Sequence, residues 1–361
     1  MAIKPLPTSD EAGTDLEIGQ EISDISKVQG RIILDYADSG DGKSSRAHSF
    51  ARYYFKKSGG KKVRLVAVED STRNVFQDLI DAGIVEAVFM TDSRSPLTTL
   101  ERILVDGDWP LLGEYDEKQV TKKVNGKEET KTIRVQKWQK REEWEGEVSA
   151  LIVEGLTTSC ELIVNYLTET GRFPREQSDG FSEGGKTYMA ASQTSYGFTQ
   201  QEGIKLLRNS GMLGVERVLW TAHEAKGKDE FGVEQAVRGP KLVGSAATDA
   251  VRKYVGVLLH ADRVKDKAGK EEVRVYLRNH PDPKNPSVAW KAKVTLTPTK
   301  AKQLLEKYPD GYFVPTLPDA DNFDSKDGLI PFLEFEEQLH KEATQAAAKF
   351  KASINKTTEN K

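Results

Sequence analysis

The feature that most constrains the fold is a glycine-bearing loop that joins an apolar run to a helix-like segment. Residues 31–55 read RIILDYADSGDGKSSRAHSFARYYF. The apolar run 32–34 predicts a strand, and Lys43 and Ser44 open the segment after the loop. Strand, glycine-bearing loop, Lys-Ser and helix is the layout of a phosphate-binding P-loop. The sequence therefore predicts an α/β protein that binds a nucleoside triphosphate with Mg²⁺.

Each residue type in this loop has a chemical role. Gly40 and Gly42 lack a Cβ, so the backbone can turn tightly and present its N–H groups to phosphate oxygens. Lys43 is placed to reach the β- and γ-phosphates, and the Ser44 hydroxyl can ligate Mg²⁺. The predicted nucleotide-binding residues are Ala37, Asp38, Ser39, Gly40, Asp41, Gly42, Lys43, Ser44 and Ser45.

The loop also departs from the usual pattern. Ala37 stands where glycine is usual, so the permissive form [AG]xxxxGK[ST] is satisfied and the strict form is not. Asp38 and Asp41 bring carboxylates to an expected polyphosphate, which weakens binding unless they face solvent or serve the metal. The alternative is a glycine-rich turn that precedes a helix by chance, and the preceding strand favours the P-loop.

Composition fits one sizeable α/β domain with appendages. The chain has 361 residues, 30% of them charged, and a net charge of −3 that favours neither a nucleic-acid partner nor its absence. The single Cys160 excludes an intramolecular disulfide, and the five histidines show no metal-ligand spacing. With no long apolar span and no signal peptide, we expect a cytoplasmic protein without a membrane partner.

Composition divides the chain into three parts. We interpret residues 1–27 as a flexible N-terminal arm, 28–297 as the ATPase core and 298–361 as a C-terminal extension with a helix and a disordered tail. Within the core, residues 107–147 are dense in Lys and Glu and contain Asn125-Gly126 between two alternating arms. Asn-Gly in that setting predicts an exposed, inserted β-hairpin. Trp138 and Trp144 are candidates to pin its base.

The apolar runs predict a mostly parallel central sheet with helices on both faces. Segments 272–279 and 288–296 alternate around a turn and predict an antiparallel pair that closes the sheet. After the strand at 32–34, the remaining core strands are predicted at 63–68, 85–90, 148–153, 215–220 and 254–260.

Open α/β sheets bind ligands at the carboxyl ends of their strands. Glu154 ends one predicted strand, where a carboxylate can hold the Mg²⁺ shell together with Ser44. Glu69 follows another strand, taken to lie beside the P-loop strand, and is the candidate base for the attacking water, with Asp70 as its competitor. The alternative for each is an ordinary surface acid after a strand.

Thr221 and His223 follow a third strand, where a polar side chain can sense the γ-phosphate. A lone histidine is more often structural, but the polar stretch 225–238 behind it could carry such a signal. The candidate catalytic residues are therefore Glu69, Lys43 and His223.

These blocks, in this order, resemble the RecA-like P-loop ATPases of bacteriophages, the group that includes phage single-strand annealing and recombination ATPases. The resembling residues are ADSGDGKSS, VAVED, ALIVEGLTT, SYGF, VLWTAHE, GPKLVGSAAT, VGVLLH, YLRNHPDP and WKAKV. The resemblance implies a RecA-type core, ATP and Mg²⁺, and a homo-oligomeric ring or filament, in the host cytoplasm if the protein is phage-encoded. Ala37, Glu154 and the charged insert depart from the pattern.

A RecA-like assembly can complete its phosphate site with a cation from the next subunit. The candidates are Arg278, Lys291 and Lys293, the last two placed by their spacing on one face of a strand, and the alternative is an ordinary solvated face. Candidate contacts to single-stranded DNA are Lys226, Lys228, Arg238 and Lys241, against the alternative of a solvated mixed-charge loop.

Three classes of function stay open at this point. The first is an ATPase of DNA recombination, annealing or replication, which acts on single-stranded DNA or a single-strand-binding protein. The second is an oligomeric motor or remodelling ATPase that acts on protein or in DNA packaging. The third is an ATP-binding structural protein with little turnover.

Overall fold

The computed structural model describes most of the chain after residue 30. Described are residues 31–339, 341–342 and 345, apart from 94, 125–126, 170–180, 184–185, 189–192, 226–236, 243–249, 283–287 and 317–321. The predicted N-terminal arm and disordered tail therefore lie outside the described residues. Within the described part, no helix is long and apolar enough to cross a membrane.

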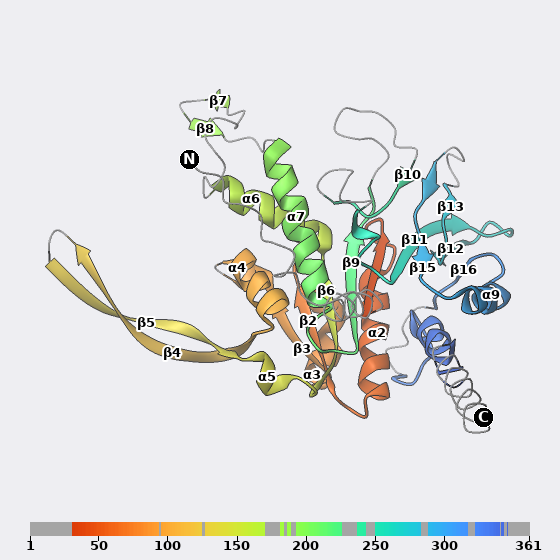
Figure 1. The fold of residues 1–361 in the computed structure, drawn as a ribbon, viewed down its shortest axis with the longest axis horizontal. Helices are drawn as coiled ribbons and strands as arrows, with labels where there is room; N and C mark the ends of the chain where they lie inside the picture. The colour runs from red at the N-terminus through yellow and green to blue at the C-terminus, as the bar shows by residue number, and fades with distance from the viewer. Residues whose placement is uncertain are drawn as a thin grey trace, which may run out of the picture.

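A twisted central sheet forms the body of the molecule (Figure 1). Its strand order is β16-β12-β11-β1-β9-β6-β2-β3, and neighbouring strands from β11 to β3 are parallel. Every residue of β1 and β6 is buried, as expected for apolar runs covered on both faces. The parallel strands are β1 (Ile32–Ala37), β2 (Lys62–Ala67), β3 (Val85–Phe89), β6 (Val148–Glu154), β9 (Arg217–His223) and β11 (Val257–Lys265).

Antiparallel strands close one side of the sheet, but not as the sequence predicts. β12 (Glu271–Tyr276) and β15 (Lys293–Val294) both pair with β11 rather than with each other. β16 (Tyr312–Phe313) then pairs with β12 at the edge. The segment that joins β12 to β15 contains β13 (His280–Pro281) and β14 (Ala289–Trp290). These two strands form a small separate sheet with β10 (Val237–Arg238). The predicted pair 272–279 and 288–296 is thus divided between two sheets.

Helices cover both faces of the sheet because residues alternate along β1. Ile32, Leu34 and Tyr36 face one apolar cluster and Ile33 and Ala37 face the other. The first cluster takes residues from α4 (Pro96–Glu101), α6 (Leu156–Glu169) and α7 (Gln193–Ser210), and the second from α2 (Lys43–Lys57), α3 (Thr72–Asp81) and α9 (Pro298–Lys307).

The fold class predicted from the sequence is confirmed. The molecule is a mixed α/β protein with a mostly parallel central sheet, helices on both faces, antiparallel strands at one side and an inserted hairpin. β9 lies between the P-loop strand β1 and the Glu154 strand β6. The sheet therefore brings three different strand ends to the loop.

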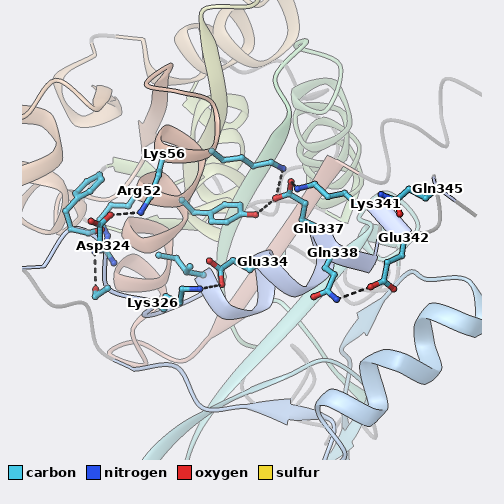
Figure 2. A pocket seen from close by; sticks show the side chains of 15 residues that line it. Arg52, Lys56, Asp324, Lys326, Glu334, Glu337, Gln338, Lys341, Glu342 and Gln345 are labelled. Carbon is cyan, nitrogen blue, oxygen red and sulfur yellow. Dashed lines mark hydrogen bonds and ion pairs between the residues drawn. The ribbon is translucent and has the colours of Figure 1, made fainter.

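The segment after residue 297 joins this body directly. Residues 330–339 are helical, and Leu329, Phe332 and Leu333 pack into the cluster that α2 borders. Between this helix and α2 lies an open groove of about 680 Å³ (Figure 2). Ion pairs cross or line it, among them Lys57–Glu337 at 3.1 Å and Lys326–Glu334 at 2.8 Å. The groove is thus a charged seam between two packed helices.

The predicted hairpin is present and projects from the body (Figure 1). β4 (Trp109–Val124) and β5 (Lys127–Gln139) pair antiparallel, and the register joins Val124 to Lys127. The predicted turn residues Asn125 and Gly126, between those two, lie outside the described residues.

A stacked arginine fixes the base of the hairpin. The guanidinium of Arg64 lies 4.4 Å from the Trp109 ring centre and 4.3 Å from that of Trp144, and donates to Gln139 at 2.8 Å. A cation between two aromatic faces is a favourable arrangement in a buried site. Trp144 thus pins the base as predicted, and so does Trp138, which packs against the core cluster and on which the Arg102 guanidinium lies at 4.1 Å.

We expect the outer hairpin to be dispensable for folding. Replacing residues 116–135 by Asn-Gly keeps the pair Tyr115–Gln136, and none of the residues in this range whose burial is described belongs to the buried core. Thermal unfolding should stay cooperative, with a midpoint within about 3 °C of the parent. Trp144→Ala is the matched control, and should lower the free energy of unfolding by about 3–5 kcal/mol. Loss of the cooperative transition in the shortened chain would show that the hairpin belongs to the folding unit.

Candidate functional site

The loop between β1 and α2 has the backbone that a phosphate site needs. Gly40 and Gly42 have φ values of 85° and 76°, a region that side chains with a Cβ rarely adopt. Gly42 is also the N-cap of α2 and provides no side-chain cap. The first N–H groups of α2 are therefore open to an anion, and the helix dipole favours negative charge there.

Lys43 curls back over the loop. Its Nζ donates to the carbonyl oxygens of Asp38 at 2.9 Å and Ala37 at 3.2 Å. Burial lowers the pKa of Lys43, opposed first by the charge of Asp35. The ammonium is thus held inside the loop by two carbonyl oxygens, where a phosphate oxygen could join them.

A buried ion pair ties strand, loop and helix together. Arg46 Nε donates to Asp35 Oδ2 at 2.7 Å and Nη2 donates to Oδ1 at 2.9 Å. Its remaining nitrogen, Nη1, donates to the Asp41 carbonyl oxygen at 2.6 Å. Asp35 is fully buried and Arg46 is 2% exposed. Neither residue was predicted from the sequence, although a carboxylate inside the apolar strand 32–37 was a usable signal.

The two loop carboxylates are engaged rather than aimed at the phosphate position. Asp41 Oδ1 accepts from Arg263 Nε at 3.1 Å, and Arg263 Nη2 also donates to the Gly40 carbonyl oxygen at 3.0 Å. Asp38 Oδ1 accepts from the Ser39 amide at 2.8 Å. Arg263, from β11, was not among the predicted residues, and it offsets part of the negative charge beside the loop.

The predicted metal ligands meet across two elements. The Ser44 hydroxyl donates to Oε1 of Glu154, which is 3% exposed at the end of β6. Among the described residues, Glu154 Oε2 and the buried Thr72 hydroxyl make no hydrogen bond of ordinary geometry. Burial raises the pKa of Glu154, opposed by the Ser44 and Thr72 hydroxyls.

These oxygen donors fit Mg²⁺. A hydroxyl and a carboxylate beside a phosphate position are what an Mg²⁺ ion uses, with water and phosphate oxygens as further ligands. The described part of the chain shows no cluster of three His, Cys, Asp or Glu side chains for a metal.

Glu69 and His223 meet at the same edge of the sheet. Glu69 Oε1 lies 3.2 Å from His223 Nε2 and accepts from the Thr158 hydroxyl at 3.0 Å. The hydrogen bond from His223 is the largest cause of the lowered pKa of Glu69, so this carboxylate is ionised at neutral pH. Asp70 is exposed and accepts instead from Thr91 at 2.7 Å. The geometry favours Glu69 over Asp70 as a base.

One premise about Glu69 was wrong. β2, the strand before it, is not beside β1, because β6 and β9 lie between them. Glu69 reaches the site from beyond the strand end, where Gly155 leaves room. Gly155 has a φ of 109°, and a Cβ there would lie 3.2 Å from Val68 and 3.4 Å from Glu69.

Threonines at the start of α6 organise these strand ends, and the sequence analysis gave them no role. The Thr157 hydroxyl accepts from the His223 amide at 3.0 Å and donates to the Lys241 carbonyl oxygen at 2.8 Å. Thr221 accepts from the Gly155 amide at 3.1 Å. Strand ends β6 and β9 are therefore held by hydroxyls that bond to backbone groups.

The remaining predicted cations lie elsewhere or are engaged. Lys226 and Lys228 lie outside the described residues. Arg238 pairs with Asp282 at 2.6 Å, and the exposed Lys241 pairs with Glu161 at 3.3 Å. None of these contacts tests DNA binding.

The predicted common strand face of Lys291 and Lys293 is wrong. β14 ends at Trp290 and β15 begins at Lys293, so the two lysines do not share one continuous strand. Lys293 Nζ donates to the Arg252 carbonyl oxygen within the same chain. Arg278 lies near the Pro309 carbonyl oxygen, at 3.5 Å.

A cavity of about 490 Å³ adjoins the loop. Gly40, Ser45 and Arg263 form its loop side, and Val273 and Val314 contribute apolar surface. Its volume is within the range of about 300–1,000 Å³ that is typical of small-molecule sites. The larger groove of Figure 2 contains no loop residue, so size alone does not mark the site.

Comparisons with known proteins add little beyond this geometry. No protein-family model matches the chain, and no curated protein matches its sequence. Among solved structures, it is similar to a KaiC-like protein from the hyperthermophilic archaeon Pyrococcus horikoshii OT3. The identity is 12%, the match covers 69% of this chain and 78% of that one, and the TM-score is 0.34. At that score the match carries no argument about the site.

The Asp35–Arg46 pair should be strongly coupled. Removing one partner leaves a buried charge unpaired, so Asp35→Ala or Arg46→Ala should each lower the free energy of unfolding by about 3–5 kcal/mol. The double variant should cost clearly less than the sum of the two. Urea unfolding of all three proteins measures the coupling.

The exposed pair Lys56–Asp324 is the matched control. Removing its partners should leave the urea midpoint unchanged, since solvent screens exposed pairs. Additive costs at Asp35 and Arg46, or costs no larger than this control, would contradict the role given to the buried pair.

Proposed function

We propose that this protein binds ATP with Mg²⁺ at the loop 37–45 and hydrolyses it. The observation that carries the proposal is the contact between Ser44 and Glu154, which joins the start of α2 to the end of β6. It places a hydroxyl, a buried carboxylate and open helix N–H groups around one point. That combination suits a metal-bound polyphosphate better than a free anion, which the carboxylate would repel.

Each residue then has a stated task. Lys43 and the N–H groups of α2 bind the β- and γ-phosphates, while Ser44 and Glu154 would hold Mg²⁺. When bound, the metal neutralises charge on the phosphate oxygens. Glu69, ionised and oriented by Thr158 and His223, accepts the proton of the attacking water. His223 connects that carboxylate to β9 and so senses the state of the site.

The cavity beside the loop is the proposed site of the nucleoside. Val273 and Val314 give apolar surface for a base, and the polar residues at the edge are suited to a ribose. The cavity borders Gly40 and Ser45, so a nucleoside there connects directly to phosphates on the loop.

The polymer substrate is a separate proposal. We favour a role in phage DNA recombination, annealing or replication, supported by the RecA-like arrangement and by the block resemblance of the sequence. An oligomeric ring or filament with a cation such as Arg278 or Lys291 in the neighbouring site belongs to the same proposal. The alternatives are a motor or remodelling ATPase and a structural protein with little turnover.

Two substitutions should separate binding from hydrolysis. Lys43→Ala removes the cation aimed at the phosphates, so it should lose most ATP affinity in a calorimetric titration without loss of folding. Glu69→Gln should still bind Mg·ATP while hydrolysing it about 10²–10⁴-fold more slowly.

Lys56→Ala, on the exposed far end of α2, is the control for both assays. Unchanged affinity and turnover in Lys43→Ala would overturn the P-loop assignment. Normal turnover in Glu69→Gln would overturn only the role of Glu69.

Turnover with and without single-stranded DNA distinguishes the classes of function. We expect stimulation by DNA, because the stretch 225–241 follows directly from the β9 end that contacts Glu69. Turnover that ignores DNA would favour the motor or remodelling class. ATP binding without turnover would favour the structural class.

A further inference from the structure

A chain of hydrogen bonds runs from the end of β9 through two buried histidines. Glu224 Oε2 lies 3.2 Å from Nε2 of His260, and His260 Nδ1 lies 2.8 Å from Nε2 of His280. His280 Nδ1 lies 3.0 Å from the Pro281 carbonyl oxygen. His260 is fully buried, with the Trp290 ring stacked on it at 4.3 Å.

The positions of the protons follow from the ends of this chain. A carbonyl oxygen only accepts, so His280 Nδ1 must carry hydrogen and donate to Pro281. Burial lowers the pKa of His280 and of His260 to about 3, so each ring disfavours a second proton. The Nε2 of neutral His280 is then an acceptor, and His260 Nδ1 donates to it. His260 Nε2 is left as a second acceptor, facing a carboxylate oxygen.

Two acceptors 3.2 Å apart would repel, so the contact needs one more proton. We propose that Glu224 and His260 share one proton, and that this pair is a positioning element that holds the P-loop lysine. The proposal rests on the proposed ATP-binding function. The pair holds one added proton whether that proton lies on the Glu224 carboxyl or on the His260 imidazole.

The link to the loop is a backbone contact. The Glu224 amide donates to the Ala37 carbonyl oxygen at 3.0 Å, and the same oxygen accepts from Lys43 Nζ at 3.2 Å. Ala37 is the first residue of the loop. Movement of Glu224 therefore changes the surroundings of the ammonium that binds phosphate.

The other end of the chain belongs to the small sheet. His280 pairs with Trp290 across β13 and β14, and the Lys291 amide donates to the Arg238 carbonyl oxygen on β10 at 3.1 Å. At Lys241 the polypeptide again lies beside the end of β9, because the Lys241 amide donates to the His223 carbonyl oxygen at 2.6 Å. His260 thus joins the nucleotide edge of the central sheet to the sheet that borders 226–236.

The surroundings of His260 identify Glu224 and His260 as the groups that exchange the proton. Asp35 pairs with Arg46 and Asp282 pairs with Arg238, whereas the carboxylate in contact with His260 Nε2 is that of Glu224. Burial raises the pKa of Tyr36 and of Tyr276, which both face the ring and stay neutral. The charged and titratable groups around His260 are Asp35, Tyr36, Arg46, Glu224, Tyr276, His280 and Asp282.

The first test needs no nucleotide. Long-range ¹H–¹⁵N correlation spectra of the full chain report which nitrogens of His260 carry hydrogen. At neutral pH we expect hydrogen on Nδ1 and a downfield, shared proton at Nε2 that is lost as the pH rises. In Glu224→Gln the amide can donate to Nε2 without an added proton, so the pH-dependent signal should vanish. A bare Nε2 with no hydrogen-bonded proton signal between it and Glu224 in the parent at neutral pH would overturn the shared proton.

The second test measures ATP affinity against pH. Loss of Lys43 charge at alkaline pH weakens binding in every variant alike, so each variant is compared with the parent at the same pH. Loss of the shared proton breaks the Glu224–His260 contact, so at alkaline pH the parent should bind ATP about tenfold more weakly than Glu224→Gln, the value of roughly one hydrogen bond. Glu224→Ala should be about tenfold weaker than Glu224→Gln at every pH. Equal affinities of the parent and Glu224→Gln at every pH would show that Glu224 is purely structural.

The outcomes separate the two proposals. If Lys43→Ala abolishes ATP binding while the Glu224 variants keep the parent profile, the positioning role is wrong and the ATP site stands. If the parent binds no ATP, the proposed function fails and the positioning role with it, and the spectra decide the shared proton alone.

Discussion

The ion pair between Asp35 and Arg46 fixes the shape on which the rest of the site depends. Arg46 holds both oxygens of a carboxylate in the middle of β1 and, with its third nitrogen, the Asp41 carbonyl oxygen of the loop. The guanidinium fork makes these bonds in one plane, which sets the distance between strand, loop and helix. A buried pair gains little net stability because both charges are desolvated. Here the pair acts on geometry, because Arg46 holds the Asp41 carbonyl oxygen of the loop at a fixed position relative to β1.

The strand order then decides which chemistry reaches that loop. β9 lies between β1 and β6, so Glu154 is not on the strand next to β1. Its carboxylate reaches Ser44 past the end of β9. Glu69 comes from farther away still and is held by Thr158 and His223. Because parallel strands end at one edge, three strand ends bring together Glu154, the proposed metal ligand, Glu69, the proposed base, and His223, which contacts Glu69. The same edge carries Glu224, so the buried histidine pair begins beside the proposed nucleotide site.

Residues close in sequence were predictable, and contacts between distant ones were less so. The glycines, Lys43 and Ser44 follow one another, so a local pattern predicted the loop, and the parallel strands followed from apolar runs. Three contacts were not predicted because they depend on packing: Asp35 with Arg46, Arg263 with the loop, and Trp109 with Arg64. Two predictions were wrong for the same reason: that β2 lies beside β1, and that 272–279 pairs with 288–296. Local periodicity gives a strand but not its neighbour, which long-range register decides.

The most direct test of the central claim is an experimental structure of the full chain with Mg²⁺ and a non-hydrolysable ATP analogue. The account predicts phosphate oxygens on the first N–H groups of α2 and on Lys43. It also predicts Mg²⁺ between Ser44 and the Glu154 side, with Glu69 facing the γ-phosphate. The nucleoside should occupy the cavity between the loop and Val314. A nucleotide bound elsewhere, or a loop 37–45 that stays empty at saturating analogue, would contradict the account.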